Sequence, residues 1–271
     1  MYPLVYHRPK TLAEAKELFG AGADATFLSG GHTLLPTMKQ RLAAPSDVID
    51  LTAIPEMRGI AVEARLLKIG AATTHAEVAE SKIVRDAIPV LAGLAGSIGD
   101  RHVRHRGTIG GSTANNDPAA DYPSAVLALG ATIVTDRRRI AADDFFTGLY
   151  QTLREPGEIV TRIEFPIPDS ACYAKFRSPA SRYSIVGVFV ARTGKTVRVA
   201  VTGAGASGVF RPTDFEAALS ADFRPEAVAH CSVDPNSLLN DLNATGEYRA
   251  HLIRVLAGRA VAKPGALQSF K

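Results

Sequence analysis

Two short glycine-containing stretches stand out in the sequence, Ser29-Gly30-Gly31-His32-Thr33 and Thr108-Ile109-Gly110-Gly111-Ser112. Each follows a predicted strand or tight loop and precedes a predicted helix start. Glycines let the backbone approach a ligand and direct several N–H groups at it, and hydroxyl groups add further donors. These stretches, called here the first and second glycine turns, therefore predict a phosphate site, with a pyrophosphate-containing dinucleotide as the first candidate ligand.

The spacing of the glycines argues against two common phosphate-binding motifs. Neither turn matches the P-loop pattern G-x-x-x-x-G-K-[ST] or the Rossmann fingerprint G-x-G-x-x-G. A glycine pair at a strand end is in most cases only a turn, so each pair alone is weak evidence for a ligand. The sequence disfavours a P-loop NTPase and an ordinary nicotinamide-dependent dehydrogenase.

Composition sets the class of protein. With 271 residues, 46% of them hydrophobic and 21% charged, the chain is long enough for two or three compact units. The net charge of +4 is small for a nucleic-acid-binding protein, and we predict no nucleic-acid partner. The two cysteines, Cys172 and Cys231, cannot by themselves hold an iron-sulfur cluster through four thiolates.

The sequence also predicts a location and the absence of a metal site. Residues 1–10 lack the features of a signal peptide, and the longest apolar stretch, residues 125–134, is far shorter than the roughly 20 residues that span a bilayer. We therefore predict a cytoplasmic protein with no membrane span. The seven histidines show no metal-ligand spacing, so no metal site is expected.

Hydrophobic periodicity and capping signals predict the elements of the first part of the chain. Capping boxes are expected at residues 11–14 and 74–77. Strands are predicted at residues 25–28, 48–51, 66–72, 131–135 and 158–165, and helices at 12–19, 34–42, 88–95 and 122–129. Residues 98–106 are predicted to form a basic loop. The first glycine turn then lies in a β-turn-α-β unit, at a strand-to-helix junction where ligands often bind.

A break is predicted near residues 165–169, where two prolines end a strand. Three consecutive strands at 173–176, 185–191 and 196–202 predict an antiparallel meander. Helices are predicted at 214–219, with a capping box at 213–216, and at 225–230 and 248–261. The fold class is therefore α+β, with a domain over residues 1–168, divided into subdomains of about 1–55 and 56–168, and a C-terminal α+β domain over 169–271.

The surroundings of both glycine turns carry a family resemblance. Residues 104–123 resemble the flavin-binding signature of the FAD-carrying medium subunit of molybdenum hydroxylases, the family of carbon monoxide dehydrogenase and of the equivalent domain in xanthine dehydrogenase. Residues 28–42 resemble the first flavin motif of that family. Further similarity lies at residues 69–77, 156–160, 182–187 and 247–252, so it runs essentially end to end. The resemblance implies a two-subdomain FAD-binding domain of the PCMH type, followed by a small C-terminal domain with a three-stranded antiparallel sheet and helices.

The resemblance also implies the residues that bind the cofactor. FAD would be held non-covalently, with its pyrophosphate on backbone N–H groups and hydroxyls of the two glycine turns. No catalytic residue is expected in this chain. The positions that carry over are Ser29, Gly30, Gly31, His32, Thr33, Leu34, Ile98, Thr108, Ile109, Gly110, Gly111, Ser112, Asp121, Ile159, Lys175 and Tyr183.

Several of these positions have a second interpretation. Asp121 matches an acid that the family places on cofactor hydroxyls, but it could equally cap the following helix. Lys175 matches a basic residue near the cofactor, and it could be a solvated strand lysine. Tyr183 matches a tyrosine beside the isoalloxazine ring, and it could be ordinary core or cross-strand packing. Ile98 and Ile159 match apolar positions in the flavin or adenine pocket, with core burial as the default.

Two positions depart from the family pattern, and two charged runs need an interpretation. Ser112 stands where the family commonly has asparagine, and Arg182 stands where an acid commonly precedes the tyrosine. The run 101–106 is interpreted as a contact with a partner subunit or the cofactor, ahead of nucleic acid. The run 137–139 is interpreted as a charged turn after a strand.

The resemblance implies an FAD-binding electron-transfer subunit of a molybdenum hydroxylase. A large subunit would hold the molybdenum cofactor and a small subunit the 2Fe-2S clusters, in a dimer of heterotrimers. The substrate, whether carbon monoxide, a purine, an N-heterocycle or an aldehyde, stays open, as does the electron acceptor. The alternatives are a self-sufficient flavin-dependent oxidase or reductase and a non-enzymatic nucleotide-binding module.

Overall fold

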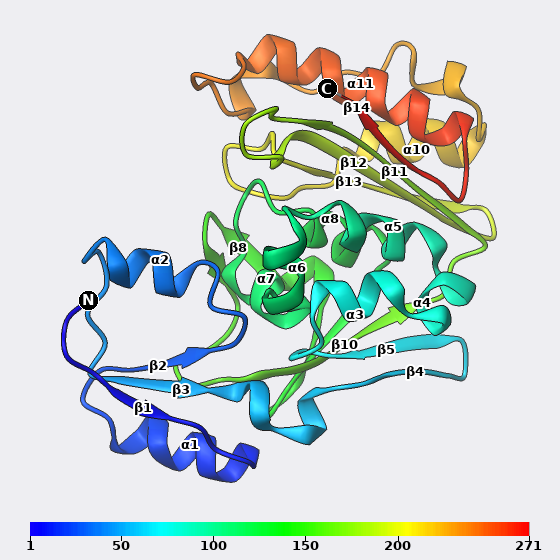
Figure 1. Ribbon diagram of the computed structural model, residues 1–271. Coiled ribbons are helices and arrows are strands. Elements are labelled where there is room, and N and C mark those ends of the chain that lie inside the picture. The colour runs from blue at the N-terminus through cyan, green and yellow to red at the C-terminus, as the bar shows by residue number, and fades with distance from the viewer. Residues whose placement is uncertain (271) are drawn as a thin grey trace.

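A computed structural model describes residues 1–270 and contains three larger sheets and a two-stranded hairpin (Figure 1). Lys271, which ends the predicted C-terminal domain, lies outside the described residues. The predicted α+β class is confirmed. The division at residue 168 stays a prediction.

The first sheet has three parallel strands in the order β1-β3-β2. Its elements are β1 (Val5–His7), α1 (Leu12–Ala21), β2 (Ala25–Leu28), α2 (Leu34–Lys39) and β3 (Asp47–Asp50). The Thr11 hydroxyl caps α1 by accepting from the Glu14 N–H at 3.1 Å, whereas the Glu14 carboxylate accepts from the Lys10 N–H, so only half of the predicted capping box forms. The first glycine turn joins β2 to α2, as predicted.

The second sheet has five strands in the order β4-β5-β10-β6-β7, with every neighbouring pair antiparallel. These strands are β4 (Ile60–Glu63), β5 (Leu66–Gly70), β6 (Thr132–Thr135), β7 (Arg139–Ala141) and β10 (Val160–Pro166). Short 3-10 helices lead into it at Leu51–Ala53 and Pro55–Met57. The associated helices are α3 (His75–Glu80), α4 (Lys82–Ala87), α5 (Pro89–Ser97), α6 (Arg101–Arg106), α7 (Ile109–Asn115), α8 (Tyr122–Ala128) and α9 (Ala142–Phe145). The hairpin β8 (Phe146–Gly148) and β9 (Gln151–Thr152) follows.

The third sheet contains the predicted meander, β11 (Ser170–Arg177), β12 (Ser184–Thr193) and β13 (Thr196–Thr202), which is confirmed. A fourth strand, β14 (Leu267–Phe270), pairs in parallel with β11 and was not predicted, because its partner is distant in sequence. The remaining helices are α10 (Thr213–Ala221), α11 (Gly246–Ala262) and 3-10 turns at Pro225–Val228 and Pro235–Ser237.

Two large cores hold these layers together, and a small third one, formed by Leu28, Met38 and Val48, lies in the first sheet. Helices α5 and α8 lie between the second and third sheets (Figure 1). One core joins side chains of both helices and both sheets, among them Leu91 of α5, Ile163 of β10 and Phe189 of β12. The opposite face of the third sheet packs against α10 and α11 in a separate core. The alternating strand residues of the third sheet therefore serve two cores, as expected for a sheet covered on both faces.

Two local predictions are wrong. Residues 101–106 form the helix α6 rather than a loop, because the Asp100 carboxylate caps it by accepting from the Val103 N–H at 2.9 Å. The predicted capping box at 213–216 does not form, since Pro212 precedes the helix and the Glu216 carboxylate instead accepts from the Val199 N–H and pairs with Arg211.

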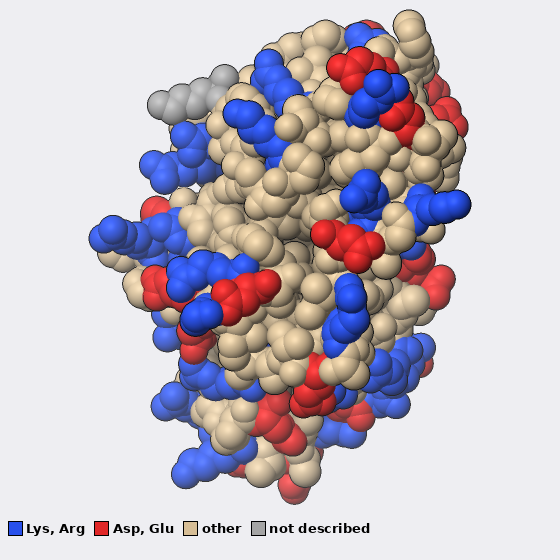
Figure 2. All heavy atoms as spheres, turned by 90° about the vertical axis from the view of Figure 1, so that its right-hand side faces the viewer, with Lys and Arg blue, Asp and Glu red and all other residues tan. Residues whose placement is uncertain are grey.

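On the face shown in Figure 2, basic and acidic side chains are interspersed and separated by neutral surface. Within residues 1–270, no helix is both long enough and apolar enough to cross a bilayer. Over the same range, no cluster of three or more His, Cys, Asp or Glu side chains is placed to hold a metal ion.

A buried arginine ties α11 to the third sheet. Arg249 is 2% exposed, and its guanidinium donates to the carbonyl oxygens of Ile185 and Gly203 and to the Asp241 carboxylate. Ile185 lies near the start of β12, and Gly203 directly follows β13. The side chain therefore satisfies backbone groups that would otherwise be buried without a partner.

Replacing this arginine by an apolar side chain of similar length should destabilise the protein. We expect Arg249→Met to lower the free energy of unfolding by about 3 kcal/mol or more, because two buried carbonyls lose charged donors. The control is Arg259→Met on the same helix, where the exposed guanidinium stacks on Phe270 and should cost about 1 kcal/mol or less. Chemical denaturation measures both, and equal losses would contradict the role given to Arg249.

Candidate functional site

A cleft of about 1020 Å³ runs between the first sheet, helices α6 and α7, and the loop between β11 and β12. This volume is at the upper end of the range for small-molecule and cofactor sites. Both glycine turns line it, together with three further segments. These are residues 25–28, 98–100 and 154–160.

The two glycine turns contact each other directly. Their hydroxyls meet, with Ser29 Oγ 2.8 Å from Thr108 Oγ1. A Cβ on Gly30 would overlap the carbonyl oxygen of Arg106, and a Cβ on Gly110 would overlap Ala71. Gly30 therefore lets the first turn pack against the backbone just before the second turn, and Gly110 lets the second turn pack against the end of β5.

The other glycine of each turn has a different role. Gly31 has a φ of +77°, in the left-handed region that glycine adopts without strain. Gly111 donates its N–H to Thr108 Oγ1 at 3.1 Å, and a Cβ there would point at the junction of the Ser29 and Thr108 hydroxyls. Gly111 thus keeps the surface between the two turns open to the cleft.

Most of the predicted site residues line this one cleft. They are Ser29, Gly30, Gly31, His32, Thr33, Leu34, Ile98, Thr108, Gly110, Gly111, Ser112, Asp121, Ile159 and Tyr183. Two predicted residues do not line it. Ile109 is fully buried in the core, and Lys175 is 1% exposed behind Asp121.

Asp121 is the centre of a buried network and does not cap α8. Its side chain makes no capping hydrogen bond. One carboxylate oxygen accepts from the hydroxyls of Tyr173 and Ser184, and the other accepts from Lys175 Nζ at 2.8 Å. The helix-cap interpretation of Asp121 and the solvated-lysine interpretation of Lys175 are therefore both wrong. A carboxylate accepts about four hydrogen bonds, so the oxygen facing Lys175 retains capacity for another donor.

Aromatic side chains lie at the mouth of the cleft. Tyr183 is 52% exposed and precedes β12, so the core-packing interpretation is wrong. Burial of its hydroxyl end and the nearby Asp117 carboxylate raise the pKa of Tyr183. Arg182, with a φ of +64°, directs its guanidinium at the Gly99 carbonyl across the mouth. Ile98 is half-buried, whereas Ile159 is 2% exposed and serves both the core and the cleft wall.

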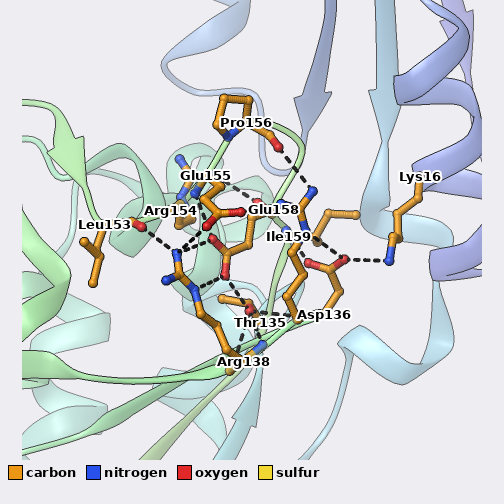
Figure 3. A network of polar contacts seen from close by, with 11 residues as sticks. Lys16, Thr135, Asp136, Arg138, Leu153, Arg154, Glu155, Pro156, Glu158 and Ile159 are labelled. Atoms are coloured by element: carbon orange, nitrogen blue, oxygen red, sulfur yellow. Dashed lines mark hydrogen bonds and ion pairs between the residues drawn. The ribbon is translucent and has the colours of Figure 1, made fainter.

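The loop at residues 154–158 is a wall of the cleft that the sequence did not predict as part of the site. Figure 3 shows how it is held. Glu158 is fully buried, and Arg138 donates to both of its carboxylate oxygens at 2.9 Å. Thr135 donates a third hydrogen bond at 2.8 Å. These donors, Arg138 foremost, lower the pKa of Glu158 to about 2, so the clamp is ionised at neutral pH.

The same loop also connects to the first sheet's helix. Asp136 is 3% exposed and accepts from the Ile159 N–H at 2.8 Å, and its other oxygen lies 3.1 Å from Lys16 Nζ on α1 (Figure 3). Arg137 pairs with Glu155 on the loop at 2.8 Å. Arg137 and Arg138 thus lie in the turn between β6 and β7, as interpreted, and their side chains also hold the cleft wall, whereas Arg139 pairs with Glu164 on β10. Glu155 and Glu158, about 20 residues further along the chain, were the sequence signal from which these ion pairs could have been predicted.

A pair of aromatic rings was also missed. Phe19 and Phe27 stack with centroids 4.7 Å apart, and both line the cleft beside the loop at residues 154–158. Gly157 lets the loop approach the Phe19 ring, because a Cβ at this position would stand only 2.8 Å from the ring. The cleft therefore has an apolar end formed by α1, β2 and the loop.

The Glu158 clamp predicts a pH dependence of stability. Its pKa is lowered from 4.5, so its contribution to stability is present above about pH 4.5 and is lost as the pH falls toward 2. Glu158→Gln should lower stability at pH 7 and give a shallower loss of stability between pH 4.5 and 2. Urea denaturation across this range measures both effects, with exposed Glu17→Gln as the control. Parallel curves for the wild type and Glu158→Gln would contradict the clamp.

Comparison with known proteins gives the same family as the sequence motifs. Residues 2–168 match the family model described as the FAD binding domain in molybdopterin dehydrogenase. The carbon monoxide dehydrogenase medium chain of Hydrogenophaga pseudoflava is 35% identical over 94% of this chain and 95% of its own length. The nicotine 6-hydroxylase medium subunit of Paenarthrobacter nicotinovorans is 32% identical, over 96% and 97%.

Solved structures extend the similarity to the whole fold. A chain of reconstituted CO dehydrogenase from Oligotropha carboxidovorans superposes with a TM-score of 0.86 at 31% identity, covering 98% of this chain and 99% of its own. A chain of quinoline 2-oxidoreductase from Pseudomonas putida 86 gives the same TM-score at 26% identity. The predicted resemblance is confirmed. This chain belongs to the family of FAD-binding domains of molybdopterin dehydrogenases.

Proposed function

We propose that this chain is the FAD-carrying electron-transfer subunit of a molybdenum hydroxylase. It would pass electrons from the iron-sulfur clusters of a partner subunit to an external acceptor. The main supporting observation is that two glycine turns, distant in sequence, pack together along one wall of a cleft of cofactor size. The family match and the medium-subunit names of the relatives support the same role.

The residues that line the cleft suit a dinucleotide. Backbone N–H groups of the glycine turns and the hydroxyls of Ser29 and Thr108 would bind the pyrophosphate. Asp121, with an oxygen able to accept one more hydrogen bond, would bind a sugar or ribityl hydroxyl. Tyr183 and Ile98 would contact the flavin ring, and Ile159 the flavin or the adenine.

Bound FAD supplies the one-electron and two-electron chemistry that a relay between clusters and an acceptor requires. The part of this chain is to bind the cofactor, to orient it and to exclude water from it. Lys175 would act through Asp121, since its ammonium group is engaged with that carboxylate. The Arg138–Glu158 clamp would hold the cleft wall in place while the cofactor is bound.

The medium-chain and medium-subunit names of the relatives support an assembly with partner subunits. A large subunit would carry the molybdenum cofactor, and a small subunit the 2Fe-2S clusters, in a dimer of heterotrimers. The choice of substrate would then lie in the large subunit, outside this chain. The cytoplasmic location predicted from the sequence stays a prediction.

Isolation of the protein in its assembled form tests this proposal. A tag on this chain should recover a large and a small partner, and the visible spectrum should show flavin and iron-sulfur absorbance. A yellow chain that purifies alone and oxidises an organic substrate would instead indicate a self-sufficient flavin enzyme. A chain that neither retains FAD nor binds it would contradict both.

The placement of the cofactor can be tested by a single substitution. Gly111→Val should abolish FAD retention, because a β-branched side chain at the junction of the two turns would fill the space next to the Ser29 and Thr108 hydroxyls. Gly96→Ala is the control, since Gly96 lies on α5 outside the cleft lining and has room for a Cβ. FAD content per chain is measured after purification. Normal FAD content in Gly111→Val would refute this placement.

A further inference from the structure

His75 lies in the cleft lining without an assigned role. It is the first residue of α3, and the Thr74–Glu77 capping box that was predicted from the sequence forms in full. The His75 backbone N–H donates to the Gly107 carbonyl at 2.9 Å. The side chain is 5% exposed and lines the cleft directly below the second glycine turn. Local structure therefore holds the ring in one place.

The surroundings of the ring indicate which nitrogen carries the proton. Burial, and after it the neighbouring His32 and Arg104 side chains, lower the pKa of His75 to about 4 against the opposing effect of Asp121, so the imidazole is neutral at neutral pH. Its Nδ1 atom is buried without a hydrogen-bond partner, on a ring that packs against Tyr122. A buried donor without a partner is rarer than a buried acceptor without one. We therefore assign the proton to Nε2, which becomes a donor.

The Nε2 atom faces the second glycine turn. A Cβ on Gly107 would stand 2.6 Å from Nε2, so only the absence of a side chain at this position lets the ring reach the turn. No hydrogen-bond partner of Nε2 occurs among residues 1–270. A buried polar side chain that lines the cleft thus has an unused donor beside Gly107, the residue that directly precedes the second glycine turn. Asp121 is the nearby negative charge, and Lys175 already neutralises it.

We propose that His75 binds the cofactor, with its Nε2–H donating a hydrogen bond to an anionic oxygen of the dinucleotide at the second glycine turn. This inference rests on the proposed function, because it requires FAD as the ligand of the cleft. It adds a side-chain donor to a phosphate site otherwise made of backbone N–H groups and hydroxyls. A neutral donor suits this place, since it binds an anion without adding a buried charge.

Two substitutions test the assigned atom. In His75→Gln the side-chain amide reaches the position of Nε2, whereas in His75→Asn it reaches only that of Nδ1. We expect His75→Gln to bind FAD within about threefold of the wild type and His75→Asn to bind about tenfold or more weakly, as for the loss of a hydrogen bond to a charged group. The dissociation constant is measured on the full chain by quenching of FAD fluorescence.

A second ligand identifies the group that His75 contacts. ADP carries the pyrophosphate without the flavin ring, so His75→Asn should weaken ADP binding, measured by calorimetry, by the same factor as FAD binding. His230→Asn, at an exposed position outside the cleft, is the matched control and should bind both ligands normally. His75→Met extends the test if His75→Asn does not fold, as judged by the melting temperature of the FAD-free protein, since it keeps the length of the side chain without a donor.

The outcomes separate this inference from the proposed function. Tight FAD binding by the wild type, together with weak FAD and ADP binding by His75→Asn and recovery in His75→Gln, supports it. Equal losses in the Gln and Asn variants, or an unchanged affinity for ADP in the Asn variant, would overturn the contact and leave FAD binding intact. A wild-type chain without affinity for FAD would overturn the proposed function and the contact together.

Discussion

The close backbone contact between the two glycine turns is the constraint on which the cleft depends. Gly30 packs against the carbonyl of Arg106, and Gly110 packs against Ala71, at separations that leave no room for a Cβ. The Ser29–Thr108 hydrogen bond joins the turns at their centre. The first turn follows β2 of the first sheet, and the second turn begins α7, which belongs with the second sheet. Their contact therefore also sets how these two parts of the chain pack together. A side chain at Gly30 would move the first sheet relative to the second, and one at Gly110 would push α7 away from the end of β5.

Charge pairs then hold the remaining walls. The buried Lys175–Asp121 pair joins β11 of the third sheet to the start of α8, with Tyr173 and Ser184 completing the hydrogen bonds of the carboxylate. The Arg138–Glu158 clamp fixes the opposite loop. A buried pair of this kind adds little net stability, but removing one partner leaves an uncompensated charge, so such pairs define one arrangement of the units.

Strands and glycine turns could be predicted because their signals are local. Alternation gave the meander of β11, β12 and β13, and the Thr74–Glu77 capping box was correct. The errors occurred where a distant partner decides. Glu216 looked like a capping residue, but Arg211 and the Val199 N–H occupy its carboxylate. β14 becomes a strand only because β11 offers it an edge. Asp121 similarly had two local interpretations until Lys175 was placed beside it.

The sequence by itself determined the family, the α+β class and the two glycine turns, because a motif of contiguous residues keeps its chemistry wherever the chain places it. Only the tertiary structure decided which residues share the cleft. It brought in Phe19, the 154–158 loop and His75, and it placed Lys175 and Ile109 outside the lining. The physical reason is that burial and hydrogen-bond partners are set by segments far apart in sequence, and no local pattern encodes which donor a buried side chain will meet.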